Sequence, residues 1–347
     1  MRNFLRSVSQ GGSPGKRNSR ALAILAIGSL FTFGPAKSAY AQCEWTAGSA
    51  TATCDGDDGS GGDILTANFD DHFDLIDNTL TLSNTDNSFI GFEAPVNAGT
   101  DAGTGDTLIV DGDNLSSIDN VDLTDVLGFE ILRKQGASTW GIAGDDSSVI
   151  EIFVEGGQVN FGVSVVDPST FTNATLLSIS GGGEVDGYLM IDDSAALGTT
   201  ISVAASSELE AQVSLGGGVD QITNYGQVSS PQIDLGDGDD LIFNYSAWDA
   251  VVLGGAGSDQ VTNNGTISGT VINPEWDLGD GDDVFSNYGT VEAEVQIDLG
   301  ADEDTLNINS GSIQGTVTLD AAGENDFLTV ASGATLAGSA LMGDGAN

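Results

Sequence analysis

Positively charged residues are nearly absent from this sequence beyond residue 41. Six of the eight Lys and Arg residues precede that point, whereas all 52 Asp and Glu residues follow it. Arg133 and Lys134 are the only cations of the remaining chain, which carries a net charge of about −50. Proteins that bind nucleic acid need many Lys and Arg contacts to phosphate groups, so this function class is excluded. Binding to anionic membrane surfaces is disfavoured for the same reason.

Histidine and proline are scarce as well. The single histidine, His72, lies near Asp71 and Asp74, where it could act as a general base. Beyond residue 41 the sequence offers no G-x-S-x-G motif, and it has no second histidine from which to build a hydrolase or a zinc site. We therefore expect no catalytic residues and no enzymatic activity. The chain has only six prolines, as expected where most backbone N–H groups donate to neighbouring strands.

Cysteine is limited to Cys43 and Cys54, which stand 11 residues apart. In an exported protein such a pair can form a lasting disulfide, and we expect one to staple an N-terminal cap over residues 42–63. The alternative is that Cys43 is the lipidated N-terminal residue of a lipoprotein. The residues before it, Tyr40-Ala41-Gln42, fit the lipoprotein pattern poorly.

Residues 1–41 have the features of a Sec-type export signal. A long basic region is followed by an apolar stretch over residues 21–33 and by Ala39-Tyr40-Ala41, an A-x-A cleavage site. The apolar stretch is too short to remain as a membrane anchor. We therefore expect a protein at the cell surface, in the outer membrane or outside the cell.

The chain beyond the signal contains an internal repeat. The seven residues Asp234–Asp240 return letter for letter at Asp277–Asp283, with looser copies around them. The closing Asp of each copy recurs at intervals of 20, 19, 24, 21 and 22 residues. A period in this range predicts a solenoid. Each copy begins with a leucine and closes with an aspartate: Leu215, Leu235, Leu253, Leu278, Leu299 and Leu319, and Asp220, Asp240, Asp259, Asp283, Asp304 and Asp326.

Three short apolar runs with period-two alternation follow each other within every repeat, which indicates strands and not helices. Strands joined by Gly, Asn and Asp corners in about 21 residues predict an all-β fold, a right-handed parallel β-helix with turns about 4.8 Å apart. We expect about 14 turns, irregular over residues 64–213 and regular over residues 214–347. The six leucines should form one buried column. Because Leu341–Asn347 looks like the opening of a further corner, we expect the chain to be truncated within a turn.

The Asp-rich corners are candidate calcium sites, since Ca²⁺ prefers carboxylate oxygens. The stretch Gly254–Thr262 also fits the nonapeptide of calcium β-rolls, although here it occurs once per turn and not in tandem. The alternative is structural, with Gly supplying positive φ and Asp capping its own turn. The candidate ligands are Asp237, Asp239, Asp240, Asp259, Asp280, Asp282 and Asp283.

Asparagine occupies one position in four successive repeats. We expect these side chains to form an amide ladder inside a corner and not a ligand site. The four residues are Asn224, Asn244, Asn263 and Asn287.

Several of these phrases resemble the passenger region of type V autotransporters, the large β-helical surface proteins of proteobacteria. The resemblance includes the long signal, the early cysteine pair, the tandem Asp-Leu-Gly-Asp-Gly-Asp-Asp and Asn-Tyr-Gly-Thr-Val phrases, and Val126–Leu132 with Thr139-Trp140. It implies a C-terminal outer-membrane barrel in the full-length protein, which is not present in this sequence. It carries over no catalytic residue.

Three functions follow from the sequence. The first is an exported, non-enzymatic passenger, a rigid stalk or adhesin that binds a host or cell-surface protein or glycan through protruding loops. The second is a calcium-binding secreted β-solenoid module. The third is a β-helical enzyme acting on acidic carbohydrate, which is disfavoured because such a substrate needs more cations than Arg133 and Lys134 provide.

Overall fold

The computed structural model describes residues 42–45, 51–55, 63–65, 79–84, 89–92, 96–97, 105–112, 118–123, 126–162, 168–191, 198–269, 275–319 and 325–343. All of them belong to one compact unit, Tyr40–Asn347. The predicted signal over residues 1–41 and the candidate base His72 lie outside the described residues. Throughout the described ranges the regular structure is β-strand, and no helix there has the length and hydrophobicity to cross a membrane.

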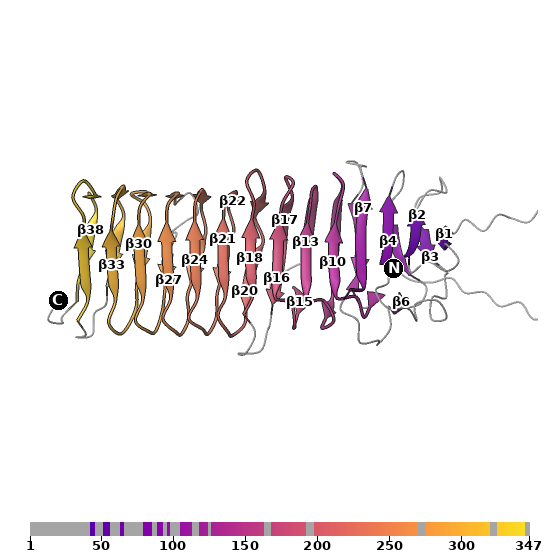
Figure 1. The fold of residues 1–347 in the computed structure, drawn as a ribbon, viewed down its shortest axis with the longest axis horizontal. Helices are drawn as coiled ribbons and strands as arrows, with labels where there is room; N and C mark the ends of the chain where they lie inside the picture. Colours follow the sequence, from indigo (N-terminus) through magenta and orange to yellow (C-terminus); the bar gives the residue numbers. More distant parts are fainter. Residues whose placement is uncertain are drawn as a thin grey trace, which may run out of the picture. The chain divides into compact units, whose positions relative to one another are not determined.

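The unit is a parallel β-helix, as the repeat predicts. Its first sheet contains 14 strands stacked in chain order, of which all but β1 run parallel to their neighbours (Figure 1). The strands are β1 Gln42–Trp45, β2 Thr51–Asp55, β4 Thr79–Asn84, β7 Thr107–Gly112, β10 Ile131–Lys134, β13 Glu151–Val154, β16 Leu176–Ile179, β18 Thr200–Val203, β21 Gln221–Asn224, β24 Leu241–Asn244, β27 Gln260–Asn263, β30 Val284–Asn287, β33 Thr305–Ile308 and β36 Phe327–Val330.

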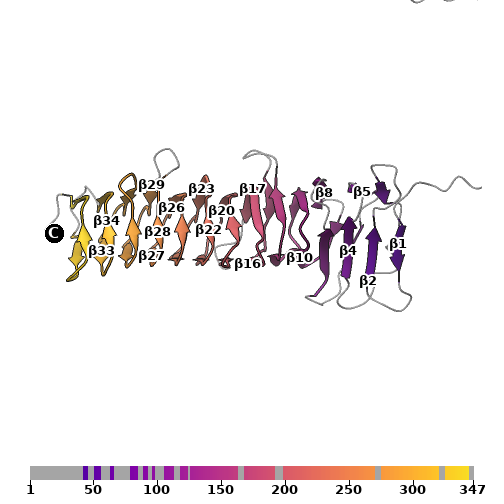
Figure 2. The ribbon, with the colours of Figure 1, turned by 90° about the horizontal axis from the view of Figure 1, so that it is seen from above.

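Two further stacks of strands complete each turn, and Figure 2 shows them from above. The second stack consists of β8 Ile118–Asp122, β11 Thr139–Ala143, β14 Gln158–Phe161, the first part of β17 Glu184–Ile191, β19 Glu208–Leu209, β22 Gln227–Val228, β25 Ala247–Trp248, β28 Thr266–Ile267, β31 Thr290–Val291, β34 Ser312–Ile313 and β37 Thr335–Leu336. The third consists of β12 Asp145–Asp146, β15 Ser169–Phe171, the second part of β17, β20 Gln212–Leu215, β23 Gln232–Asp234, β26 Val251–Leu253, β29 Glu275–Asp277, β32 Gln296–Asp298, β35 Thr316–Thr318 and β38 Ser339–Leu341.

The regular part has about 9 turns of roughly 22 residues between β10 and β36. The turn length agrees with the predicted value of about 21 residues, whereas the number of turns is smaller than the roughly 14 predicted for the whole chain. Strands β2, β4 and β7 continue the first sheet toward the N-terminus. Beside them, in the residues that the structure describes, β3 (Asp63–Leu65) pairs with β5 (Phe89–Phe92) and β6 (Val96–Asn97) with β9 (Val126–Leu127) in small separate sheets.

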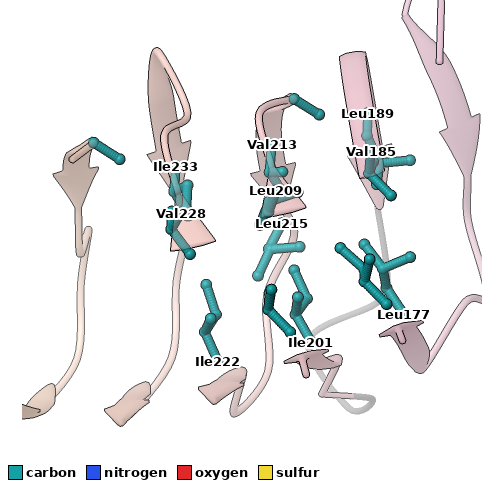
Figure 3. Packing of buried hydrophobic residues seen from close by; sticks show 14 of the residues in the cluster. Leu177, Val185, Leu189, Ile201, Leu209, Val213, Leu215, Ile222, Val228 and Ile233 are labelled. Atoms are coloured by element: carbon teal, nitrogen blue, oxygen red, sulfur yellow. The ribbon is translucent and has the colours of Figure 1, made fainter. Parts of the chain in front are cut away.

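Alternate residues of each strand point inward, and aliphatic side chains from the three stacks meet in one continuous core. Figure 3 shows this packing at the level of Leu177, Ile201 and Ile222. In the first sheet each inward residue lies above its equivalent, for example Ile201 above Ile222 and Ile222 above Ile242. Burial of this repeated pattern drives the coiling of the chain, because no single turn can cover its own apolar face.

The predicted leucine column is confirmed at five positions and wrong at Leu253. That residue is half-buried and pairs with Asp234 and Asp277, on the outward side of the third stack. Gly254 takes the inward position, where a Cβ atom would lie 2.4 Å from Asp259 Oδ2 and 2.2 Å from the Leu278 carbonyl oxygen. The one-residue shift exchanges the two faces of the strand. The five confirmed leucines are Leu215, Leu235, Leu278, Leu299 and Leu319.

The N-terminal strands β1 and β2 form an antiparallel pair in which Cys43 lies opposite Cys54. Opposite Cα atoms of such a pair are about 4.5–5.5 Å apart, a separation that a disulfide can bridge. The backbone register therefore suits the predicted staple. The disulfide itself and the alternative of lipidation at Cys43 stay predictions.

Candidate functional site

The closing aspartates of the repeats form a buried column, here called the Asp ladder. Each of them directly precedes a strand of the first sheet, and none is more than 3% exposed. An aspartate at this position is fixed by the corner before it, where Gly residues with positive φ, such as Gly236 at 94°, turn the chain sharply. The ladder consists of Asp220, Asp240, Asp259, Asp283, Asp304 and Asp326.

Hydrogen bonds join successive members of the Asp ladder in one direction. The backbone N–H of Asp240 donates to Oδ1 of Asp259 at 2.8 Å, and the N–H of Asp259 donates to Oδ1 of Asp283 at 2.7 Å. The same contact links the other members, and the ladder begins where Thr199 N donates to Asp220 Oδ1 at 2.6 Å. Each carboxyl group thus satisfies a backbone donor at the corner of the preceding turn.

The interior of the Asp ladder favours the neutral form of its acids. Burial raises the pKa of Asp259 to about 7, and repulsion from Asp239 adds to this. Burial also raises the pKa of Asp283 to about 8, reinforced by repulsion from Asp259, Asp304 and Asp282. The second carboxyl oxygens, Oδ2 of Asp259 and of Asp283, are buried without a hydrogen-bond partner among the described residues. A buried carboxylate in such surroundings is costly, so protonation is the expected response.

The structure divides the seven calcium candidates into two sets. Asp240, Asp259 and Asp283 are buried in the Asp ladder, whereas the four others are exposed on the corners. Nowhere in the described residues do three or more Asp, Glu, His or Cys side chains come together in a group that could hold a metal ion. Calcium binding stays a hypothesis. The exposed candidates are Asp237, Asp239, Asp280 and Asp282.

Acidic and neutral corners alternate along the stack at the position of Asp237. Bridges pair Asp237 with Ala256, and Ala256 with Asp280, so that each acidic corner has a neutral neighbour. Exposed carboxylates about 4.8 Å apart repel by roughly 1 kcal/mol in water, and the alternation avoids this cost. Only the Asp ladder is acidic at every level from Asp220 to Asp326.

The predicted amide ladder, here called the Asn ladder, is confirmed. Asn224 Nδ2 donates to Asn244 Oδ1 at 2.9 Å, Asn244 to Asn263 at 2.8 Å, and Asn263 to Asn287 at 2.8 Å. All four side chains are fully buried. The oxygens of Asn224 and Asn263 also accept backbone N–H groups two residues ahead in the same turn. These amides therefore stabilise the corner after each first-sheet strand and leave no atom for a ligand.

Arg133 and Lys134 are both engaged in internal contacts at β10. Lys134 is 1% exposed, and its Nζ donates to the carbonyl oxygens of Gln135, of Gly136 at 3.0 Å and of Gly156 at 3.3 Å. Arg133 pairs with Glu155, and its guanidinium lies 4.3 Å from the ring centre of Phe153. Sequence reasoning missed this burial. The alternation of Leu132 and Lys134 along the strand was the available signal.

Exposed tyrosines follow the Asn ladder, a feature that sequence reasoning also missed. Tyr225, Tyr245 and Tyr288 are 52%, 44% and 47% exposed. The rings of Tyr225 and Tyr245 are stacked, with centroids 4.8 Å apart and planes 7° from parallel. The signal in the sequence was an aromatic residue after Asn in three of four repeats.

A groove of about 300 Å³ lies beside Tyr225 and crosses three successive turns. It is lined by Ser206, Ser207, Glu208, Tyr225, Gly226, Gln227, Ser246 and Ala247, and is here called the Tyr225 groove. An aromatic ring, a carboxylate, an amide and hydroxyl groups offer a ligand both stacking and polar contacts.

The sequence matches no protein-family model, and no curated protein or solved structure shows significant similarity to it.

Proposed function

We propose that the chain is an exported, non-enzymatic passenger of an autotransporter-like protein, a surface stalk or adhesin that binds through protruding loops. The observation that supports this best is the position of the distinctive polar residues. Inside the corners, each carboxyl group of the Asp ladder accepts a backbone N–H of the preceding turn, and the amides of the Asn ladder bond to one another. They strengthen a repetitive scaffold, and contacts with other molecules are left to the outward-facing turns.

The engagement of the two cations favours this proposal over a carbohydrate enzyme. An enzyme acting on acidic polysaccharide needs cationic groups in its groove to meet the substrate's carboxylates. Lys134 is buried against backbone carbonyl oxygens, and Arg133 is held by Glu155 and Phe153. Neither side chain is oriented for such a substrate.

The proposal includes export through residues 1–41 and a location at the bacterial surface, in the outer membrane or outside the cell. An outer-membrane barrel in the full-length protein would carry the passenger across. The partner would be a protein or glycan of a host or of another cell.

Protease treatment of intact cells tests the proposal. We expect the wild-type protein to begin at Gln42 and to be cleaved by protease added outside the cells. The variant Ala41→Tyr removes the small residue before the cleavage site and should retain the uncleaved signal. Wild-type protein that keeps Met1 and resists external protease until the cells are lysed would overturn the proposal.

A further inference from the structure

Tyr225 lines the groove and is 52% exposed. Tyr245 stacks on one face of its ring. The preceding turn places only a small side chain at its level. Val203 pairs with Asn224, which places Ala204 at the level of Tyr225, and a methyl group cannot cover a ring. The stack of rings therefore ends with a surface that a planar group can extend.

A carboxylate lines the same groove as Tyr225. Glu208 lines the groove, and its Oε1 accepts hydrogen bonds from Ser229 Oγ at 2.6 Å and from Gln227 Nε2. These two neutral donors fix the carboxylate in place but leave its charge uncompensated. Glu208 is thus held rigidly at the wall of the groove, ready to pair with a positive group.

Further acids surround Glu208. Glu184 lies next to it in register, and Glu210 shares a hydrogen bond with it. Burial raises the pKa of Glu184 and of Glu210, and repulsion from Glu208 adds to both shifts. Arg133 and Lys134 are committed to contacts at β10. A neutral sugar in the groove would leave the repulsion among these acids unrelieved, whereas a cation would relieve it.

The protein already contains one example of the contact that this groove could make. The guanidinium of Arg133 lies over the ring of Phe153 at 4.3 Å and pairs with Glu155, two residues further along. In the groove the ring and the carboxylate come from neighbouring turns, because Glu208 pairs in register with Gln227, two residues after Tyr225. Tyr225 provides the ring and Glu208 the carboxylate, and a guanidinium would have to come from another molecule.

We propose that the Tyr225 groove binds an exposed arginine of a partner protein, whose guanidinium stacks on Tyr225 and pairs with Glu208. Guanidinium suits the site better than ammonium because it is planar and offers a fork of donors to a carboxylate. This inference rests on the proposed function, because it gives the exported chain a protein partner. The strong negative charge of the chain would also speed the approach of a basic surface.

Peptide titration of the purified full chain, followed by the NMR signals of the tyrosine rings, tests this inference. The probes are acetyl-Gly-Arg-Gly-amide and its lysine counterpart. We expect the arginine peptide to bind more tightly and to shift the ring signals of Tyr225. Glu208→Gln should weaken its binding by about fivefold and Tyr225→Leu by about threefold, since both contacts lie near the surface.

Two matched variants control for net charge and for loss of a tyrosine. Glu303→Gln removes one exposed charge several turns away, and Tyr288→Leu removes an exposed tyrosine that does not line the groove. Both should bind the arginine peptide as the wild type does. Equal affinity for the two peptides, or equal weakening in the control variants, would show non-specific attraction and overturn the inference.

A neutral oligosaccharide that shifts the Tyr225 signals where the arginine peptide does not would also overturn it and would assign the groove to a glycan. The titration uses purified protein, so its result is separate from that of the protease experiment on cells. A chain that binds the peptide but stays inside the cell would refute the surface location and leave the groove assignment intact.

Discussion

The turns from β10 to β18 and those from β21 to β30 share one fold but close their first-sheet corners differently. After the strand, the earlier turns place Lys134, Val154, Ile179 and Val203 where the later turns place the Asn ladder. Before the strand, the earlier turns have Glu130, Ile150, Thr175 and Thr199 in place of the Asp ladder. The turns thus stack without either ladder, with aliphatic packing and with other polar contacts such as those of Lys134 and Thr199 at the corners. The ladders are an addition to that packing.

The two ladders fix the register and the length of the first-sheet strand in each turn that has them. In each turn that has both ladders, the Asn lies four positions after the Asp, although the length of the turn varies between 19 and 24 residues. Extra residues are therefore accommodated elsewhere in the turn. A slip of one residue in the first sheet would break two rows of buried hydrogen bonds at once, which a purely aliphatic strand would not suffer.

The largest expected effect comes from a charge placed in the column that both regions share. Leu278→Asp puts an unpaired carboxylate into the core of the ladder turns, and we expect those turns to unfold locally at a cost of at least about 4 kcal/mol. The turns around β10 to β16 should stay folded, because each turn contacts only its neighbours. Hydrogen exchange resolved along the chain measures this difference.

Leu253→Asp is the matched control, since Leu253 is half-buried on the outward side of its strand. The new carboxylate would lie between Asp234 and Asp277, and repulsion of roughly 1 kcal/mol from each should keep the cost at about 2 kcal/mol, below that of Leu278→Asp. If the two variants were equally destabilised, the assignment of inward and outward faces would be wrong. Uniform loss of protection along the whole chain after Leu278→Asp would contradict local stability.

The second effect is a dependence on pH that should be strongest in the ladder turns. The folded pKa values of about 7 for Asp259 and about 8 for Asp283 exceed the ordinary value of 3.8. The folded state therefore binds protons more tightly than the unfolded one. This stabilisation is complete below about pH 4 and is lost as the pH rises toward 8, at about 1.4 kcal/mol per unit of pKa difference.

Urea unfolding followed by the fluorescence of Trp248 and Trp276 should give midpoints that fall from pH 5 to pH 9. Asp259→Asn removes one titrating group and keeps the acceptor oxygen, so we expect a flatter pH profile. Glu303→Gln removes an exposed charge and should leave the slope close to that of the wild type. Midpoints that rise over this range would contradict a protonated Asp ladder.

A third test exchanges the corner side chains of the two regions. Val203→Asn places an amide next to Asn224, where it can extend the Asn ladder by one turn. Val154→Asn places the same amide between Lys134 and Ile179, away from any ladder member. Because an unpaired buried amide costs about 1–3 kcal/mol more than a paired one, we expect Val154→Asn to be the more destabilising variant in urea unfolding. Equal losses would mean that ladder hydrogen bonds add nothing at this corner.

The smallest effect concerns calcium. Ala256→Asp combined with Ser258→Asp makes three successive corners acidic, and repulsion of about 1 kcal/mol per carboxylate pair should lower the melting temperature in EDTA by a few degrees. We expect millimolar Ca²⁺ to restore it, while the wild type responds little to either condition. A wild-type melting temperature that rises strongly with Ca²⁺ would favour the calcium-binding module.

The period of the repeat predicted the fold because Asp and Asn return with the same spacing in successive turns from β21 to β30. The Asn ladder could be predicted too, since identical side chains at one position of a stack must meet. The position of Leu253 had a signal that was missed, because Leu253 stands six residues before its closing Asp259, whereas Leu235 and Leu278 stand five residues before theirs.

The Tyr225 groove could not be predicted from the sequence. It depends on Ala204, Glu208 and Tyr225, which lie in two different turns and become neighbours through the register of β18 with β21 and of β19 with β22. The burial of Lys134 likewise depends on contacts with a neighbouring turn. A long aliphatic stem lets its ammonium reach the carbonyl oxygens at the corner, which a residue-by-residue reading of charge does not reveal.

The hydrogen bonds of both ladders run in the same direction along the stack. Each turn donates, from Asp N–H and from Asn Nδ2, to acceptors that the next turn of the sequence provides. A ladder turn therefore becomes complete only after about one further turn of chain has been laid down beside it. Peeling the stack from its C-terminal side strips acceptors from the turn that remains, whereas peeling it from the other side strips only donors. The solenoid thus has a mechanical polarity, and pulling on its two ends should meet unequal resistance.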